Sequence, residues 1–300
     1  KILAGLFNSG YKITSVFTQP DKKIGRKQKY AQSPVKIYSL NKKIPVFSPE
    51  KINKQAIEKI KRQLPDLIIV AAYGKILPKS VLDIPKFGSL NVHASLLPKF
   101  RGASPIQNAI LSGEKETGVT IMLMDEGIDT GDILSQKKLE IKNQENSVQL
   151  SERLANLGSK LILETIPEWL NGEITAKKQD ASQSTFCRLI KREDGKINWQ
   201  KSAQEIFNQY RALQPWPGIY TYWKKSNINK RLKLNKIRLL DDILDNNLKP
   251  GEVKKNKKGV IVGTAKGAII LEDIQMEGKN NTNISEFLNG HADLIGSKLT

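Results

Sequence analysis

The fold class follows from one stretch, residues 66–94, which reads DLIIVAAYGKILPKSVLDIPKFGSLNVHA. Residues 66–73 form a continuous apolar run that ends at a glycine, which is typical of a parallel strand covered on both faces. A short helix is expected over residues 78–83, and residues 89–94 read as the next strand. A strand, a helix and a second strand in succession predict an α/β fold built on a parallel sheet.

The same alternation extends over the first half of the chain. Strands are expected at residues 12–18, 44–47 and 118–125, with an extended hairpin arm at 132–141. Helices are expected at residues 33–40, 54–63, 104–113 and 147–170. Right-handed crossovers would then place ligands beyond the carboxyl ends of the strands. The first ten residues read as a short helix, so the opening strand of such a domain is expected to be absent from this sequence.

The pattern changes near residue 185. A linker is expected over residues 186–205, and a helix over 202–213. Short β segments follow at residues 220–223, 232–239, 259–262 and 268–274. We therefore predict a catalytic domain over residues 1–185 and a small OB-like β-barrel over 206–300.

Composition limits the function classes. The net charge of the 300 residues is +19, which fits either an anionic partner or a genome biased towards lysine codons. Residues 22–43 hold eight basic side chains and no acidic ones. The longest apolar run, residues 67–73, is far shorter than the roughly 20 residues that cross a bilayer, and no signal peptide is expected. A single cysteine, Cys187, fits a reducing compartment, so a cytoplasmic protein is predicted.

Several common catalytic motifs are absent from the sequence. It holds no G-x-G-x-x-G or G-x-x-x-x-G-K-[ST] loop, no pair of cysteines, no His-x-x-x-His and no G-x-S-x-G elbow. A phosphate-cradling loop, a bound metal and serine-nucleophile chemistry are therefore not expected.

Asn91 and His93 are the residues that suggest chemistry. They lie two positions apart on an expected strand and therefore face the same side. An amide and a protonated imidazole both donate hydrogen bonds, and together they suit an oxyanion forming on a carbonyl carbon. Asp129 lies between two glycines in the run MDEGIDTGDIL, and a carboxylate near a histidine raises its pKa. A lone histidine on a strand is commonly a structural residue, so the pattern alone leaves both interpretations open.

Residues 89–134, SLNVHASLLPKFRGASPIQNAILSGEKETGVTIMLMDEGIDTGDIL, closely resemble the formyltransferase family that uses 10-formyltetrahydrofolate. The N-V-H-x-S-L-L-P and R-G-A-x-P-I-Q runs are specific to that family. The resemblance extends from residue 16 into the C-terminal β segments, so it covers nearly the whole chain. It implies a Rossmann-like parallel-sheet formyltransferase domain followed by the OB-like barrel.

The resemblance also implies a set of site residues. Asn91, His93 and Asp129 match the family's catalytic asparagine, histidine and aspartate. The folate-binding run of the family matches Ser95, Leu96, Leu97 and Pro98. We expect the pterin ring near this run and near Tyr73, although Tyr73 alone is equally consistent with an ordinary strand end. Family members often have glycine where this chain has Ala94, and they begin with a strand that this sequence lacks.

A basic segment, DKKIGRKQK at residues 21–29, matches a tRNA-binding loop of one branch of the family. Arg26 matches the key arginine of that loop, and Lys22, Lys23, Lys27 and Lys29 surround it. A bare charge run of this kind is otherwise typical of a solvated loop. A second tRNA-facing surface is expected on the C-terminal β-domain, at Lys224, Lys225, Lys230, Arg231, Lys233 and Lys236.

That branch formylates the α-amino group of methionine carried by initiator tRNA, in the cytoplasm of bacteria or in organelles of bacterial origin. The resemblance implies a monomer that uses no metal and no membrane. Three alternatives stay open. A formyltransferase acting on a sugar-nucleotide amine would not need the basic loop, and a folate enzyme of purine synthesis would lack the basic β-domain. A non-catalytic RNA-binding protein would leave Asn91, His93 and the S-L-L-P run unexplained.

Overall fold

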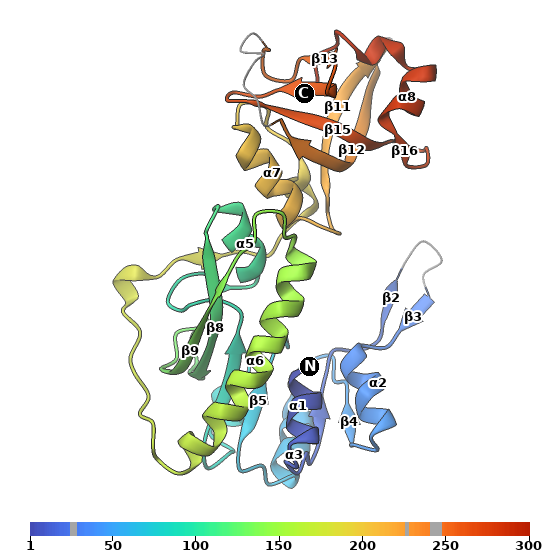
Figure 1. Ribbon diagram of the computed structural model, residues 1–300. Helices are drawn as coiled ribbons and strands as arrows, with labels where there is room; N and C mark the ends of the chain where they lie inside the picture. Colours follow the sequence, from blue (N-terminus) through green and yellow to red (C-terminus); the bar gives the residue numbers. More distant parts are fainter. Residues whose placement is uncertain (25–28, 226–227, 241–247) are drawn as a thin grey trace. The chain divides into compact units, whose positions relative to one another are not determined.

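The computed structural model describes residues 1–24, 29–225, 228–240 and 248–300 (Figure 1). The chain divides into two compact units. The first unit holds residues 1–105, 116–140 and 151–188, and the second holds residues 106–115, 141–150 and 189–300. The two units do not divide at a single point of the sequence, because residues 106–115 and 141–150 belong to the second unit. The expected domain limits at residues 185 and 205 therefore stay predictions.

The first unit is built on a four-stranded sheet in the order β5-β6-β8-β9. Strands β5 (Ile68–Val70) and β6 (Ser89–His93) run parallel, with Val70 opposite Asn91. Strands β8 (Glu116–Leu123) and β9 (Ile133–Glu140) continue the sheet with antiparallel pairing. The predicted α/β class is thus confirmed, and the hairpin arm supplies an antiparallel edge.

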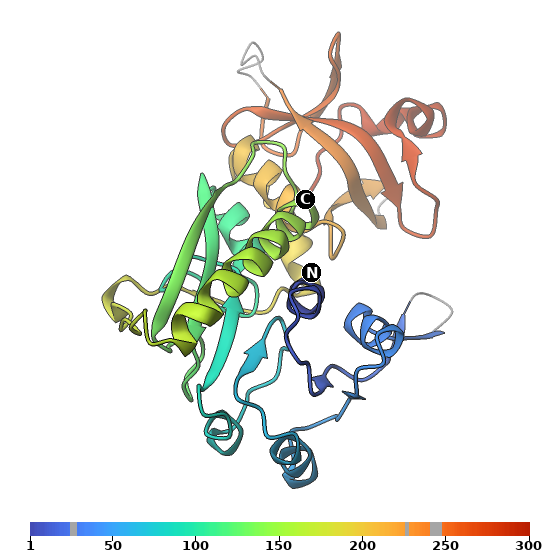
Figure 2. The same ribbon diagram turned by 60° about the horizontal axis from the view of Figure 1, so that its bottom comes forward.

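The N-terminal part of this unit alternates short helices and strands (Figure 2). Strands β1 (Val16–Phe17) and β4 (Val46–Phe47) pair in parallel as a separate two-stranded sheet. The helices are α1 (Ile2–Asn8), α2 (Pro34–Asn41), α3 (Lys54–Arg62) and α4 (Lys79–Leu82). Ser33 caps α2 as expected, because its side chain accepts the Lys36 backbone N–H at 3.1 Å.

Strand β5 is less buried than its apolar sequence predicts. All three of its residues are half-buried, not fully buried. Among the described strands β5 pairs only with β6, so it lies at an edge of the sheet. Its apolar side chains, Ile68 and Val70, pack against a cluster formed by Ile60, Leu77, Val81 and Leu82.

Helix α6 (Ser147–Leu170) runs along one face of the four-stranded sheet (Figure 1). Its Gly158 allows a close approach, since a Cβ at that position would lie 2.8 Å from Cγ1 of Val92 on β6. Val92 therefore faces the helix. Because neighbouring residues on a strand face opposite sides, Asn91 and His93 point to the other face, as the sequence predicts.

The basic segment holds two short strands that pair with each other and are here called the β2–β3 hairpin, whereas a bare charge run is typical of a solvated loop. Strand β2 (Lys22–Ile24) pairs antiparallel with β3 (Lys29–Ala31). Lys23 lies opposite Tyr30, and its ammonium nitrogen is 5.5 Å from the centre of that ring. Lys23 thus makes a cross-strand contact that the charge run alone does not predict.

The second unit is an antiparallel β structure whose sheet curls around its buried face (Figure 2). The strand order is β11-β12-β15-β14-β13, and β16 pairs with β15. The strands are β11 (Ile219–Lys225), β12 (Ile228–Leu239), β13 (Val253–Asn256), β14 (Gly259–Gly263), β15 (Ala268–Met276) and β16 (Thr282–Asn283). This confirms the β segments read from the sequence.

Two α-helices, α7 and α8, lie wholly in the second unit. Helix α7 (Ala203–Ala212) opens with a reciprocal capping box between Ser202 and Glu205, and α8 (Ile284–Gly290) follows β16. The remaining elements are α5 (Pro105–Leu111) and the parallel pair β7 (Arg101–Gly102) and β10 (Phe186–Cys187). None of the helices in the described part of the chain combines the length and hydropathy that crossing a bilayer requires.

Candidate functional site

Three side chains meet at the carboxyl end of β6. The amide nitrogen of Asn91 donates a hydrogen bond to Oδ1 of Asp129 at 3.3 Å. Nδ1 of His93 lies 3.5 Å from Oδ2 of the same carboxylate. The structure therefore brings together the asparagine, the histidine and the aspartate that the sequence singled out, although 36 to 38 positions separate Asp129 from the other two.

Asp129 occupies an unusual turn after β8. Its φ is 52°, in the left-handed region that aspartate tolerates better than most non-glycine residues. Gly131 beyond it allows the chain to pass close to β8, because a Cβ there would collide with the backbone carbonyl of Leu123. The backbone N–H of Gly102 donates to Oδ2 of Asp129 at 2.8 Å. The carboxylate is thus aimed at β6 by contacts on both oxygens.

His93 is buried, and both of its ring nitrogens face acceptors. Nε2 donates to the carbonyl oxygen of Phe100 at 3.1 Å, and Nδ1 faces Asp129. Burial lowers the pKa of His93, while the negative charge of Asp129 and the Phe100 carbonyl act in the opposite direction. Desolvation outweighs the two others, so the imidazole is mostly neutral near pH 7. A neighbouring carboxylate alone predicts a raised pKa for His93; this prediction is wrong because burial has the larger effect.

The S-L-L-P run forms a tight turn tied to β8 and β9. The Ser95 hydroxyl donates to the Lys99 carbonyl at 2.6 Å, and Thr120 Oγ1 donates to the Ser95 carbonyl at 2.7 Å. The carbonyl of Leu97 accepts from Gln136, and the Leu97–Pro98 peptide bond is cis. Ser95 and Leu97 are buried, whereas Leu96 and Pro98 are half-buried. Leu96 and Pro98 are consequently the two members of the run whose side chains keep exposed surface.

Tyr73 lies in a different environment. Its ring packs against the cluster that contains Ile60 and Leu77. Burial raises the pKa of Tyr73, and its hydroxyl has no hydrogen-bond partner within the described part of the chain. Its backbone carbonyl accepts from Gln19 at 2.6 Å. The contacts of Tyr73 are those of a residue at the end of an apolar strand, with one unsatisfied polar atom.

The predicted tRNA-binding residues fall on both units. Lys22, Lys23 and Lys29 lie on the β2–β3 hairpin and are exposed, while Arg26 and Lys27 lie outside the described residues. In the second unit several of the predicted cations are paired. Lys225 lies 3.3 Å from Asp293, Lys236 lies 3.0 Å from Glu272, and Arg231 lies 3.8 Å from Glu277. Ion pairs therefore neutralise part of the charge of the predicted surface on the second unit.

Two residues that sequence reasoning did not assign join the site. Arg101 is 5% exposed and donates from Nε and Nη2 to Oε1 of Gln179, at 3.1 and 2.7 Å. Gln179 in turn donates to the backbone carbonyl of Asp129 at 2.9 Å. Arg101 stands in the quoted R-G-A run and offered a signal. Gln179 lies 50 positions after Asp129 in a segment without regular periodicity, so nothing local marks it.

The three groups are chemically able to support transfer at a carbonyl carbon. An amide donor, an imidazole and a carboxylate meet within hydrogen-bonding range, in the arrangement that stabilises an oxyanion and accepts a proton. Across the described ranges, no group of three or more His, Cys, Asp or Glu side chains is placed to hold a metal ion.

Two family models match the sequence. One, described as formyl transferase, covers residues 3–166, and the other, formyl transferase, C-terminal domain, covers residues 189–292. The chain belongs to the formyl transferase family and is an enzyme of that family.

Its curated relatives make the branch of the family clear. The chain is 45% identical over 289 residues to a protein of Thermodesulfovibrio yellowstonii, which covers 96% of this chain and 91% of the relative. It is 42% identical over 291 residues to a protein of Caldanaerobacter subterraneus subsp. tengcongensis, which covers 96% and 92%. Both relatives are named methionyl-tRNA formyltransferase.

Solved structures share the fold at lower identity. The N-formyltransferase from Helicobacter canadensis, in complex with folinic acid and dTDP-3-aminofucose, has a TM-score of 0.65 at 22% identity, covering 90% of this chain and 93% of that chain. HypX from Aquifex aeolicus, in complex with tetrahydrofolic acid, has a TM-score of 0.63 at 16% identity, covering 95% and 48%.

Proposed function

We propose that this protein transfers the formyl group of 10-formyltetrahydrofolate to the α-amino group of methionine on initiator methionyl-tRNA. The observation that carries the proposal is the meeting of Asn91, His93 and Asp129 at the carboxyl end of β6. The names of relatives that align over nearly the whole chain support formyl transfer with methionyl-tRNA as the acceptor. The free, buried Cys187 fits the reducing cytoplasm in which such a reaction would take place.

The proposed mechanism is direct transfer through a tetrahedral intermediate. The neutral amine attacks the formyl carbon, and a C–N bond forms while negative charge develops on the formyl oxygen. The Asn91 amide and protonated His93 donate hydrogen bonds to that oxygen, and for this Nε2 of His93 exchanges its bond to the Phe100 carbonyl for one to the substrate. Asp129 orients His93 and accepts the proton of the attacking amine. The bond to N10 then breaks, Asp129 passes the proton that it took from the amine to N10, and N10 leaves as a secondary amine.

The lowered pKa of His93 constrains this mechanism. In the free protein the imidazolium is the minor form near neutral pH, because burial disfavours its charge. A negative formyl oxygen beside Asn91 would stabilise that charge. His93 is therefore proposed to take up a proton from solvent as the oxyanion develops and to return it when the carbonyl re-forms. The charge of His93 then interacts with the transition state more strongly than with the ground state, which lowers the barrier.

The folate is proposed to bind along the S-L-L-P turn. Ser95 and Leu97 hold the turn by buried hydrogen bonds, and Leu96 and Pro98 keep exposed apolar surface for the ring. Tyr73 is proposed to contact the pterin through its hydroxyl, since a ligand would satisfy that buried atom. The folate compounds named with the solved relatives support a ligand of this class.

The tRNA is proposed to bind the β2–β3 hairpin through Lys22, Lys23 and Lys29, together with Arg26 and Lys27 of the same segment. Exposed lysines with few acidic neighbours suit phosphate contacts, which position a nucleic acid without reading its sequence. The basic strands of the second unit would form a further contact surface. We propose that the protein acts as a monomer and without a membrane partner.

The test is formyl transfer from 10-formyltetrahydrofolate to charged initiator tRNA, compared between this chain and its Asn91→Ala variant. The variant is expected to lose about 10²–10³ in rate, as other oxyanion donors do. A loss below about tenfold would remove Asn91 from this role. A dTDP-aminosugar serves as the alternative acceptor, and faster transfer to it than to the tRNA would contradict the proposed acceptor.

A further inference from the structure

We infer that Gln179, held by Arg101, is a positioning residue for Asp129 and fixes the turn that aims its carboxylate at Asn91 and His93. The inference rests on the proposed function, in which that carboxylate acts during formyl transfer. Gln179 does not touch the reacting atoms. It acts through the backbone of the turn that carries Asp129.

The contact between Arg101 and Gln179 consists of two charge-assisted hydrogen bonds. Two nitrogens of one guanidinium, Nε and Nη2, donate to the same amide oxygen of Gln179 at 3.1 and 2.7 Å. Arg101 is 5% exposed, so the bonds form where the dielectric is low. A cation bonded to the oxygen of an amide polarises the amide and strengthens its N–H donors. Arg101 thereby orients and polarises Gln179.

The amide nitrogen of Gln179 donates both of its hydrogen bonds to the turn that carries Asp129. It donates to the backbone carbonyl of Asp129 at 2.9 Å and to that of Gly131 at 2.7 Å. These two carbonyls bracket the residue after Asp129, so one side chain fixes the direction of two peptide units. Asp129 has a φ of 52°, a conformation that a chain leaves readily unless neighbouring contacts hold it.

Contacts on the other side of the turn are local. Thr130 donates to Asp125 at 2.7 Å, and the Gly127 backbone N–H donates to the same carboxylate oxygen at 3.0 Å. These bonds close the loop on itself without connecting it to β6. The ends of the loop are tied to the sheet by backbone hydrogen bonds, from Met124 to the Ser89 carbonyl and from Leu123 to the Asp132 carbonyl, both at 2.8 Å. At Asp129 itself, the contacts with distant parts of the first unit come from its carboxylate and from Gln179. If Gln179 is removed, the carboxylate has to hold the turn as well as face the reacting group.

Arg101 is itself held in place by a strand pair. Strand β7 pairs with β10, and the Arg101 carbonyl accepts from the Cys187 thiol at 3.1 Å. Its guanidinium lies 5.9 Å from the centre of the Phe186 ring.

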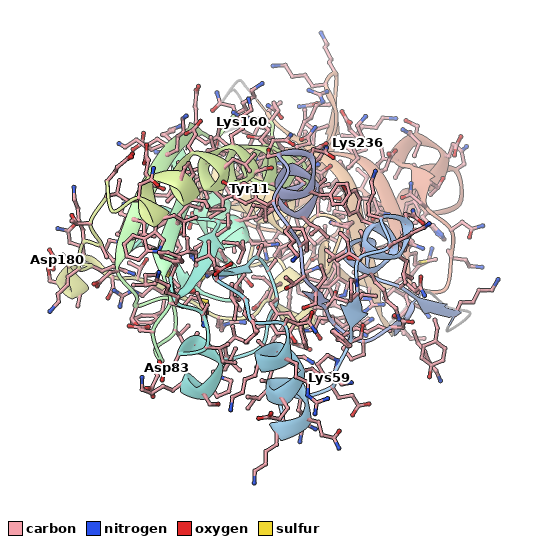
Figure 3. The ribbon with its side chains drawn as sticks, turned by 90° about the horizontal axis from the view of Figure 1, so that it is seen from below. Tyr11, Lys59, Asp83, Lys160, Asp180 and Lys236 are labelled. Carbon is pink, nitrogen blue, oxygen red and sulfur yellow. The ribbon has the colours of Figure 1, made fainter. Side chains whose placement is uncertain are left out.

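Asp180, directly after Gln179, is exposed and lies at the periphery of the molecule (Figure 3). The segment thus turns one side chain inward to the Asp129 turn and the next one out to solvent.

The experiment compares Gln179→Ala and Gln179→Glu with a matched control, Gln183→Ala. Gln183 belongs to the same segment, is exposed and donates to Asp180. Gln179→Glu keeps the size of the side chain and its acceptor for Arg101 but removes the N–H donors. We expect both Gln179 variants to lower kcat about 10–100-fold with KM for the tRNA unchanged, because a misplacement of about 1 Å is that costly. The control is expected to keep the wild-type kcat.

Two further measurements separate positioning from a general loss of structure. In an Asp129→Asn background, adding Gln179→Ala should change kcat less than about twofold, since Gln179 acts through that carboxylate. The pKa of His93, followed by NMR, should fall below its wild-type value in Gln179→Ala as the opposing influence of Asp129 weakens. The chain has only two histidines, so one His93→Gln sample assigns the signal.

Each outcome has a definite meaning. Wild-type kcat and an unchanged His93 titration in both Gln179 variants would overturn the inference. An additive loss in the Asp129→Asn background would also overturn it. If Gln179→Ala does not fold, the isosteric Gln179→Glu decides. If Asp129→Asn transfers formyl groups at the wild-type rate, the proposed role of Asp129 fails, whereas the His93 titration still reports whether Gln179 positions the turn.

Discussion

The protonation of His93 can be read from the pH dependence of stability. Its folded-state pKa is lowered from the ordinary value of 6.5, mainly by burial. Below about pH 6.5 the unfolded chain therefore binds a proton at this residue that the folded chain does not bind. Stability is lost as the pH falls, and the loss ends only when the pH passes the folded-state pKa. The slope is at most about 1.4 kcal/mol per pH unit for one such group.

The assay is urea unfolding at intervals between pH 7.5 and 5.0, comparing the wild type with His93→Gln. The difference in free energy of unfolding between the two proteins isolates His93 from the other titrating groups. We expect the wild type to lose stability relative to the variant as the pH falls through 6.5. Asp129→Asn should increase the loss, because it removes the charge that opposes the shift.

The opposite slope would refute the reasoning. Both ring nitrogens of His93 face acceptors, the Phe100 carbonyl and the Asp129 carboxylate. If these contacts outweighed burial, the folded-state pKa would be raised, and stability would increase relative to His93→Gln as the pH fell. His93 would then be protonated in the free protein, before any oxyanion forms.

Two further predictions concern the Asp129 turn and the basic hairpin. Gly131→Ala is expected to lower kcat of formyl transfer at least tenfold, because its Cβ would collide with the Leu123 carbonyl and displace the turn. A shift of the turn near 1 Å corresponds to a loss of about 10²-fold in kcat. Replacing Lys22, Lys23 and Lys29 by glutamine is expected to weaken tRNA binding. The slope of the logarithm of the binding constant against the logarithm of the salt concentration should become less steep, by about 0.7–0.9 for each phosphate that the variant no longer neutralises. An unchanged slope, measured by filter binding between 50 and 200 mM salt, would place the tRNA elsewhere.

Periodicity and turn chemistry predict most of the fold. The alternation of buried residues along β11, with Ile219, Thr221 and Trp223 facing the core, is visible in the sequence because one face of that sheet is buried. Strand β5 shows the limit of this reasoning. Its apolar run predicts burial on both faces, but burial depends on which strands pair beside it, and that information lies far away in the chain.

One part of the candidate site is predictable from the sequence, and the other part depends on how distant segments pack. Asn91 and His93 share a strand, so their common direction follows from local geometry. The approach of Asp129 depends on a left-handed turn and on a glycine that clears the Leu123 backbone, neither of which a spacing rule expresses. Family resemblance named Asp129 without explaining its placement. The desolvation of His93 is likewise a property of packing, which composition does not contain.

The contacts around Asp129 give a physical reason why its loop is not free to vary. A flexible glycine-flanked loop suggests motion, yet the carboxylate accepts from Asn91 and Gly102 while the backbone accepts from Gln179. A carboxylate that is to take a proton from an amine has to be in place before the amine arrives, since ordering the loop during the reaction would add to the barrier. The strained turn is then the conformation in which all three contacts can form at once, and its conformational cost is met before the substrate binds.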